Sequence, residues 1–282
     1  MDSKRQISAR VMTLGSSCAV STIERGNTSA LFELSGRPLL IDFPGDVCRK
    51  LLQAGVDPLD VKTAVLTHRH VDHLHGLPSF VHECIQLCKP LRAARPNTPG
   101  PMAELNLICP ESDADLVERT LDLFGLAEQS DLYRVNLHPL PVTAEGETAK
   151  GELWDGWRYE AIGGRHGSLA PLGLVIQHDG AGWKLIWSSD TEPAARLLSR
   201  ASGAQILLHD TQAASPMAAH GDADTLIAML NEHGWPDLFV PMHLPADDTE
   251  IAAIRTELDR VAPDRFRMPD DGVWLLDLRA AT

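Results

Sequence analysis

The chain has 282 residues, of which 44% are hydrophobic and 23% are charged, and its formal net charge is −14. This composition excludes a chain that is disordered throughout, and no segment approaches the roughly 20 consecutive apolar residues that a membrane span requires. The excess of acid also disfavours long polyanionic substrates, because proteins that bind nucleic acid depend on clustered Lys and Arg.

The first half of the chain predicts strands that are followed by helices. The run Thr63–Thr67 is apolar and continuous, as is typical of a buried strand. Ser112 is a candidate N-cap, and the proline-rich segment 89–101 is expected to form a loop. The expected strands are 10–15, 29–34, 38–43, 63–67 and 105–109, and the expected helices are 46–55, 77–88 and 112–123.

The second half repeats this order, with strands first and then alternating helices and strands. The turn sequence Asp179–Gly182 predicts a hairpin between two strands. The expected strands are 157–162, 172–178, 183–187, 205–208, 238–240 and 273–278, and the expected helices are 193–201, 225–233 and 247–261. Two strand-rich blocks, each followed by helices, predict two sheets with helices on their outer faces.

The cysteines and the first residues of the chain indicate in which cellular compartment the protein is expected. Five cysteines without regular spacing favour reduced thiols over disulfides. The opening residues do not form an apolar signal core. We therefore expect a cytoplasmic protein that makes no membrane contact and folds as one domain over residues 1–282.

The segment from His68 to His75 carries the strongest chemical signal. It places four histidines and Asp72 directly after the buried strand 63–67. Imidazole nitrogens and carboxylate oxygens are ligands that suit zinc, manganese or iron. The pattern predicts a metal site at the end of this strand.

This segment resembles the HxHxDH signature of the metallo-β-lactamase superfamily. The resemblance implies a four-layer αββα sandwich with two metal ions at one edge of its sheets. It assigns His68 and His70 to the first metal, and Asp72 and His73 to the second. His75 lies beyond the motif, so that at most a role behind the ligands or toward the substrate is expected for it.

Three further residues follow in the order of the same family, each near the end of an expected strand. His166 resembles the third histidine of the first site, Asp190 the bridging aspartate, and His243 the last ligand of the second site. A lone histidine near a strand end is more often a hydrogen-bonded structural residue, so the assignment depends on the order of all three. The implied cofactors are two divalent ions, with zinc preferred and manganese or iron as alternatives.

Other segments resemble the ribonuclease Z-like branch of the superfamily, in which a histidine after the bridging aspartate assists phosphodiester cleavage. The segments are 14–17, 40–42, 207–211 and 219–220. His220 takes that position but precedes Gly-Asp instead of Ser-Thr, which leaves both substrate contact and helix capping open. Asp42, His209 and Asp210 are candidates for orienting the ligands or for purely structural hydrogen bonds.

The spacing of the ligands bears on the substrate. Ribonuclease Z carries its tRNA-binding arm between the third histidine and the bridging aspartate, where this chain has room only for two strands. The resemblance therefore implies a ribonuclease Z-like hydrolase without that arm, for which tRNA is not the expected partner. A homodimer remains an option, because dimers are common in the family.

The predicted function is that of a binuclear metal-dependent hydrolase. Two metal ions that share a water lower its pKa and make a bridging hydroxide available at neutral pH. A small phosphodiester or cyclic nucleotide is the favoured substrate, with Asp72 orienting the nucleophile and His220 near the substrate. A lactone or thioester hydrolase is the alternative.

An iron-dependent oxidoreductase is less favoured, because the chain has no room for a flavin domain and carries all seven ligands. A metal-free binding protein would require a decayed ligand set.

Overall fold

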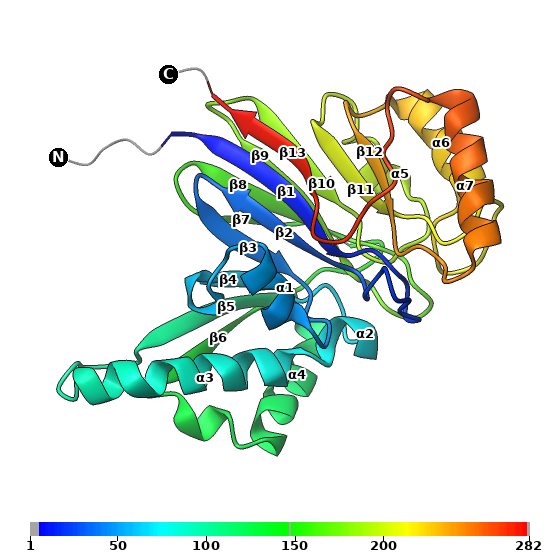
Figure 1. Ribbon diagram of the computed structural model, residues 1–282. Coiled ribbons are helices and arrows are strands. Elements are labelled where there is room, and N and C mark those ends of the chain that lie inside the picture. Colours follow the sequence, from blue (N-terminus) through cyan, green and yellow to red (C-terminus); the bar gives the residue numbers. More distant parts are fainter. Residues whose placement is uncertain (1–5, 147, 281–282) are drawn as a thin grey trace.

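The computed structural model describes residues 6–146 and 148–280 and shows two sheets packed face to face, with helices on both outer faces (Figure 1). The first sheet has the order β13-β1-β2-β3-β4-β5-β6, and the second has the order β12-β11-β10-β9-β8-β7. The predicted αββα layers are therefore present.

The first sheet and its helices come mainly from the first half of the chain. Its strands are β1 (Ser8–Gly15), β2 (Ser29–Leu34), β3 (Arg37–Ile41), β4 (Thr63–Val65), β5 (Ala103–Pro110), β6 (Tyr133–Leu140) and, from the far end of the chain, β13 (Trp274–Arg279). The helices of this half are α1 (Val47–Gln53), α2 (Val71–Leu74), α3 (Leu77–Ala94) and α4 (Glu111–Leu123), with short 3-10 turns η1 (Pro58–Asp60) and η2 (Ala127–Gln129).

The second sheet comes from the second half. Its strands are β7 (Ala149–Glu152), β8 (Trp157–Gly163), β9 (Leu172–His178), β10 (Trp183–Trp187), β11 (Ile206–Asp210) and β12 (Phe239–Met242). The helices are α5 (Ala195–Leu198), α6 (Ala223–His233) and α7 (Asp248–Val261). Asp222 and Asp247 cap α6 and α7, because each side chain accepts a hydrogen bond from a backbone N–H of the first turn.

The central strands of both sheets, such as β2, β9 and β11, are buried on both faces, which explains why they are nearly continuous apolar runs. In β2, Phe32 points into the core between the sheets, whereas its neighbour Leu31 packs against the helices of the first layer. In β11, Leu208 belongs to the core between the sheets and Leu207 to the core under α5, α6 and α7. Three apolar layers thus hold the four structural layers together.

The topology gathers several strand ends at one edge. β3, β4 and β5 are parallel, and so are β10, β11 and β12. The carboxyl ends of both groups open to the same edge, where the N–H of Leu172 donates to the carbonyl of Thr67 across the two sheets at 2.9 Å. Side chains that follow these strands are therefore brought together.

Some expected elements differ from the structure. The loop expected from Lys89 is wrong over its first residues, because α3 continues to Ala94 despite Pro90. Ser112 is not an N-cap: α4 begins at Glu111, and the Ser112 hydroxyl donates to Asp113 inside the first turn. β6 and β7 were not predicted, because their side chains are largely half-buried or exposed and lack an apolar alternation.

All five cysteines lie in the described part of the chain, where they are buried and unpaired. Among residues 6–146 and 148–280, no helix has the length and apolar character needed to cross a membrane.

Candidate metal centre

The structure brings the seven predicted ligands to the shared edge of the two sheets. His68 and His70 lie on the loop after β4, and Asp72 and His73 lie on the short helix α2. The other three follow β8, β10 and β12: they are His166, Asp190 and His243. Their potential ligand atoms form two groups, each within 4.8 Å: His68, His70 and His166 in the first, and Asp72, His73, Asp190 and His243 in the second.

The distances within the groups are those of neighbouring ligands of one ion. His70 Nδ1 lies 3.0 Å from His166 Nε2, and His73 Nε2 lies 3.4 Å from Asp72 Oδ2. Because zinc–nitrogen bonds are about 2.0–2.1 Å long, two ligands of a tetrahedral zinc stand roughly 3–3.5 Å apart. The spacing of the donors therefore suits a metal ion in each group.

Asp190 lies between the two groups. Its Oδ2 is 3.2 Å from His73 Nε2 and 3.8 Å from His68 Nε2, and its Oδ1 is 3.2 Å from His243 Nδ1. The side chain is almost fully buried. This is the position that a bridging aspartate would take.

Several buried atoms of the centre lack the partners that a cation would provide. His68 Nε2 and Asp190 Oδ1 are buried without a hydrogen-bond partner. The Nδ1 of His166 donates to the carbonyl of Ala219 at 2.7 Å, so its Nε2 carries a lone pair that faces His70 Nδ1. Unpartnered buried polar atoms are costly, and the donor set therefore fits metal ions.

The electrostatics keep the carboxylate charged and two of the imidazoles neutral. The pKa of Asp190 lies well below its ordinary value, because the positive charge of His73, whose own pKa Asp190 and Asp42 raise, and the hydrogen bond to it oppose the burial that would raise the Asp190 pKa. Burial lowers the pKa of His68 well below its ordinary value and that of His243 to about 4. Neutral imidazoles and ionised carboxylates are the forms that bind metal.

Asp42 fixes the orientation of His73. Its Oδ2 accepts a hydrogen bond from His73 Nδ1 at 2.8 Å, and the carboxylate also accepts from the backbone N–H and the hydroxyl of Thr67 at 2.7 and 2.8 Å. This arrangement leaves His73 Nε2 for the second group. Such partners hold a ligand's tautomer and raise its basicity, so Asp42 has the orienting position that the sequence left open.

His220 lies beside the centre but outside both ligand groups. Its Nδ1 is 2.8 Å from Asp210 Oδ2, which also accepts from the N–H of Thr191 at 2.9 Å. The His220 ring stacks on that of His243, with centroids 5.0 Å apart, and meets His166 edge-on at 4.5 Å. Asp210 therefore holds His220 against the metal ligands.

The structure separates two other candidate histidines from the ligands. His209 is fully buried, and its Nδ1 donates to the carbonyl of Asp210 at 2.7 Å. Burial lowers the pKa of His209 to about 4. His75 is exposed, and its Nδ1 donates to the carbonyl of Val71 at 2.7 Å. Neither side chain belongs to the two groups.

Strained backbone surrounds the centre. Asp42, Ser189, Ala219 and His243 have positive φ angles of 62°, 60°, 69° and 56°. Residues other than glycine adopt such angles at a cost and keep them where the surrounding contacts hold the backbone. These four positions all adjoin or supply the side chains described above.

Sequence reasoning missed some partners of the ligands. Thr28 Oγ1 lies 3.2 Å from His243 Nδ1, and the carbonyl of Ala219 accepts from His166. Thr28 precedes β2 without any motif, and Ala219 acts through its backbone. Only Thr67 and Thr191, which flank predicted ligands, carried a signal in the sequence.

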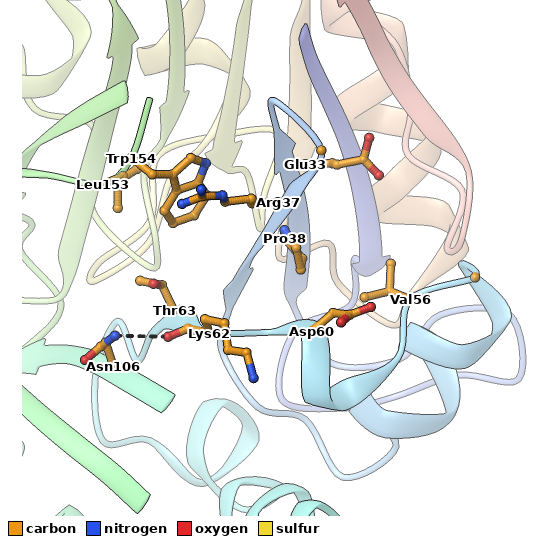
Figure 2. A pocket seen from close by; sticks show the side chains of 12 residues that line it. Glu33, Arg37, Pro38, Val56, Asp60, Lys62, Thr63, Asn106, Leu153 and Trp154 are labelled. Atoms are coloured by element: carbon orange, nitrogen blue, oxygen red, sulfur yellow. Dashed lines mark hydrogen bonds between the residues drawn. The ribbon is translucent and has the colours of Figure 1, made fainter. Parts of the chain in front are cut away.

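A cavity of about 610 Å³ lies away from the centre (Figure 2). It opens at the amino ends of β3 and β4, where Arg37, Lys62 and Trp154 line it, whereas the ligands follow the carboxyl ends of strands. None of the predicted site residues lines this cavity. It is therefore separate from the candidate metal centre.

Removal of metal should lower the thermal stability of the protein. An ion present at 100 times its dissociation constant stabilises the folded state by about 2.7 kcal/mol, which for a chain of this size corresponds to roughly 5 °C in Tm. We expect this fall after dialysis against a chelator, and its reversal by zinc, in a thermal unfolding scan. An unchanged Tm after complete removal of metal would contradict the metal assignment.

The sequence is similar to known proteins over part of its length. The family model described as Anti-Pycsar protein Apyc1 matches residues 9–98, which include the segment from His68 to His75. Ribonuclease Z of Mycobacterium bovis (strain BCG / Pasteur 1173P2) is 27% identical over 208 residues, which cover 71% of this chain and 69% of the relative.

The folds of two solved structures match that of this protein over nearly the whole chain. The metallo-β-lactamase fold protein YhfI from Bacillus subtilis matches with a TM-score of 0.74 at 15% identity, covering 97% of this chain and all of that one (100%). A diphosphatase from the PhnP family matches with a TM-score of 0.66 at 20% identity, covering 97% of this chain and 99% of that one. At these identities the likeness concerns the fold, and it confirms the predicted sandwich.

Proposed function

We propose that this chain, a metallo-β-lactamase fold protein with distant ribonuclease Z-like homologues, is a binuclear metal-dependent phosphodiesterase that acts on a small phosphodiester or cyclic nucleotide. The observation that carries the proposal is the convergence of two His/Asp groups with the His220–Asp210 pair at one edge of the sheets. Zinc is the metal that we expect, because histidine nitrogens and carboxylate oxygens supply every ligand.

Each residue of the centre has a task in this proposal. His68, His70 and His166 would hold one ion, and Asp72, His73, Asp190 and His243 would hold the other. The bound ions would supply Lewis-acid activation of water and of the phosphoryl oxygen.

The acid–base work falls to Asp72 and His220. Asp72 is half-buried, and hydrogen bonding to His73 outweighs burial and lowers the pKa of its carboxyl to about 2, so it is ionised and able to accept a hydrogen bond that orients the nucleophile. Because Asp210 engages Nδ1 of His220, Nε2 is the nitrogen left for the substrate, and the ring, once protonated on both nitrogens, would give its Nε2 proton to the leaving oxygen. Asp210 is thus a positioning residue.

The similar proteins support a phosphorus ester as the substrate. Apyc1 names a cyclic nucleotide phosphodiesterase family, and the chains compared above include a ribonuclease and a diphosphatase. The chain between His166 and Asp190 consists of β9, β10 and short connections. Together with the net charge of −14, this supports a small substrate instead of tRNA.

The proposal is tested with purified protein that is stripped of metal and reloaded separately with zinc and manganese. Bis(p-nitrophenyl) phosphate and 3′,5′-cyclic nucleotides are the substrates, and lactones and thioesters are the comparison set. We expect metal-dependent turnover of at least one diester. Turnover of a lactone or thioester alone, by protein that has bound metal, would overturn the phosphodiesterase assignment.

A further inference from the structure

We propose that the substrate carries a second anionic group, which Arg69 and Arg165 bind in a cleft beside the metal centre. This inference rests on the proposed phosphodiesterase function and narrows its substrate class. It concerns a phosphate or carboxylate that lies apart from the bond to be cleaved.

The backbone places both arginines next to the first ligand group. Arg69 lies between His68 and His70, and Arg165 directly precedes His166. The contact of 3.0 Å between His70 Nδ1 and His166 Nε2 holds the two segments together. Both arginines line one cavity of about 520 Å³, which is also lined by the hydroxyl-bearing residues Ser112, Thr143 and Ser168.

Arg69 is anchored but keeps donors free. Its Nη1 lies 3.3 Å from Oδ1 of Asp113, whose side chain is 2% exposed. The Arg69 side chain itself is 43% exposed. A guanidinium has five N–H donors in a planar fork, so one ion pair fixes its direction and leaves donors for an anion in the cleft.

Arg165 has a fixed backbone and a replaceable partner. Its N–H donates to Thr191 Oγ1 at 2.9 Å, and its carbonyl accepts from the N–H of Glu192 at 2.9 Å. The guanidinium pairs with Glu145 at 2.9 Å, but that glutamate is 84% exposed. Such surface pairs contribute little, and an incoming phosphate, which guanidinium binds in a bidentate manner, would displace the carboxylate.

The overall charge makes this pair of arginines significant. A chain with a net charge of −14 repels a substrate that carries two anionic groups. Two guanidinium groups beside the first ligand group lower that repulsion locally, on the side of the centre where Arg69 and Arg165 stand. A substrate with a single anionic group would use only the metal centre.

The test compares the dinucleotide ApA with its two singly phosphorylated forms, pApA and ApAp, in the metal-loaded enzyme. We expect one of the phosphorylated forms to have a KM about tenfold below that of ApA. In Arg165→Gln this advantage should disappear, so that the ratio of the KM for ApA to that for the favoured phosphorylated form falls to about one. Glu145→Gln should lower the KM of the favoured form further, because it removes the competitor for Arg165.

Arg158→Gln is the matched control, because Arg158 also forms an exposed pair, with Asp179 at 2.6 Å, on a different surface. Arg69→Gln leaves the buried Asp113 without its ion-pair partner and can therefore destabilise the protein. The KM values of this variant are compared with those of the parent only if the two proteins have the same Tm. Equal KM values for all three substrates in the parent, or an advantage that survives in Arg165→Gln, would overturn the proposal.

A binding measurement separates this inference from the proposed function. Methylphosphonate-linked dinucleotides with and without a terminal phosphate are titrated calorimetrically into the metal-loaded protein, so that no turnover is needed. Tighter binding of the phosphorylated analogue, lost in Arg165→Gln, supports the cleft even where no diester is hydrolysed. Equal binding of both analogues overturns it even where ApA is a substrate.

Discussion

Replacing Asp190 with asparagine should reduce metal-dependent turnover by more than about 100-fold. Mutation of a residue that only hydrogen-bonds to a metal ligand costs up to about 100-fold in metal affinity or activity, and loss of a ligand itself should cost more. The carboxylate contacts histidines of both ligand groups, with Oδ2 3.2 Å from His73 Nε2 and 3.8 Å from His68 Nε2. Asparagine keeps the shape of the side chain. It removes the negative charge, however, and its amide group presents N–H donors to a site built for cations.

Metal content and turnover should be measured together on Asp190→Asn after dialysis against buffer with a fixed concentration of free zinc. We expect the bound metal per chain to fall along with the rate. Asp277→Asn, a change at a half-exposed carboxylate on β13, is the control and should alter neither quantity. If Asp190→Asn retained both the parental metal content and the parental rate, Asp190 would have no part in the centre.

Replacing His220 with asparagine should lower kcat by about 10²- to 10⁴-fold, which is the contribution of a positioned general acid. Metal content should not change, because His220 belongs to neither ligand group. Asp210→Asn should cause part of the same loss, since the 2.8 Å contact to Nδ1 sets which nitrogen of His220 faces the substrate.

The leaving group distinguishes proton donation from a structural role. For His220→Asn, the loss in kcat should be large with a nucleotide diester, whose leaving alkoxide needs a proton. It should be small with bis(p-nitrophenyl) phosphate, whose leaving phenolate does not. His82→Asn, at an exposed histidine on α3 whose Nε2 lies 3.3 Å from Nε2 of Gln86, is the control. An equal loss with both substrates, or a loss of metal, would exclude the role of proton donor.

The sequence predicted well those elements whose local pattern matches their environment. The strands Leu172–His178 and Trp183–Trp187 have the bounds expected from their apolar runs and from the turn between them. β6 and β7 were not predicted, because edge and half-exposed strands such as Ala149–Glu152 are held by pairing with a neighbour instead of by burial. Their strand character depends on tertiary structure.

The candidate centre could be predicted from the order of its motifs, and the structure places all seven residues in two groups. His75 shows that closeness in sequence to the ligands is not enough to predict a ligand. It follows α2 immediately, but its side chain is exposed and its Nδ1 donates to the carbonyl of Val71, so His75 stands apart from the two ligand groups. Partners such as Thr28 come from segments far away in the chain, and no local pattern marks them.

The division of the ligands between two sheets has a consequence for the unfolded chain. His70 and His166 meet at one edge although they are separated by roughly 100 residues, and a link across so long a loop restricts the unfolded chain by roughly 4–5 kcal/mol in the loop-entropy treatment of disulfides. An ion held by both histidines would thus act as a reversible crosslink between the two halves of the chain. In a protein whose five cysteines are all buried and unpaired in the described residues, coordination would take the place of covalent bridges.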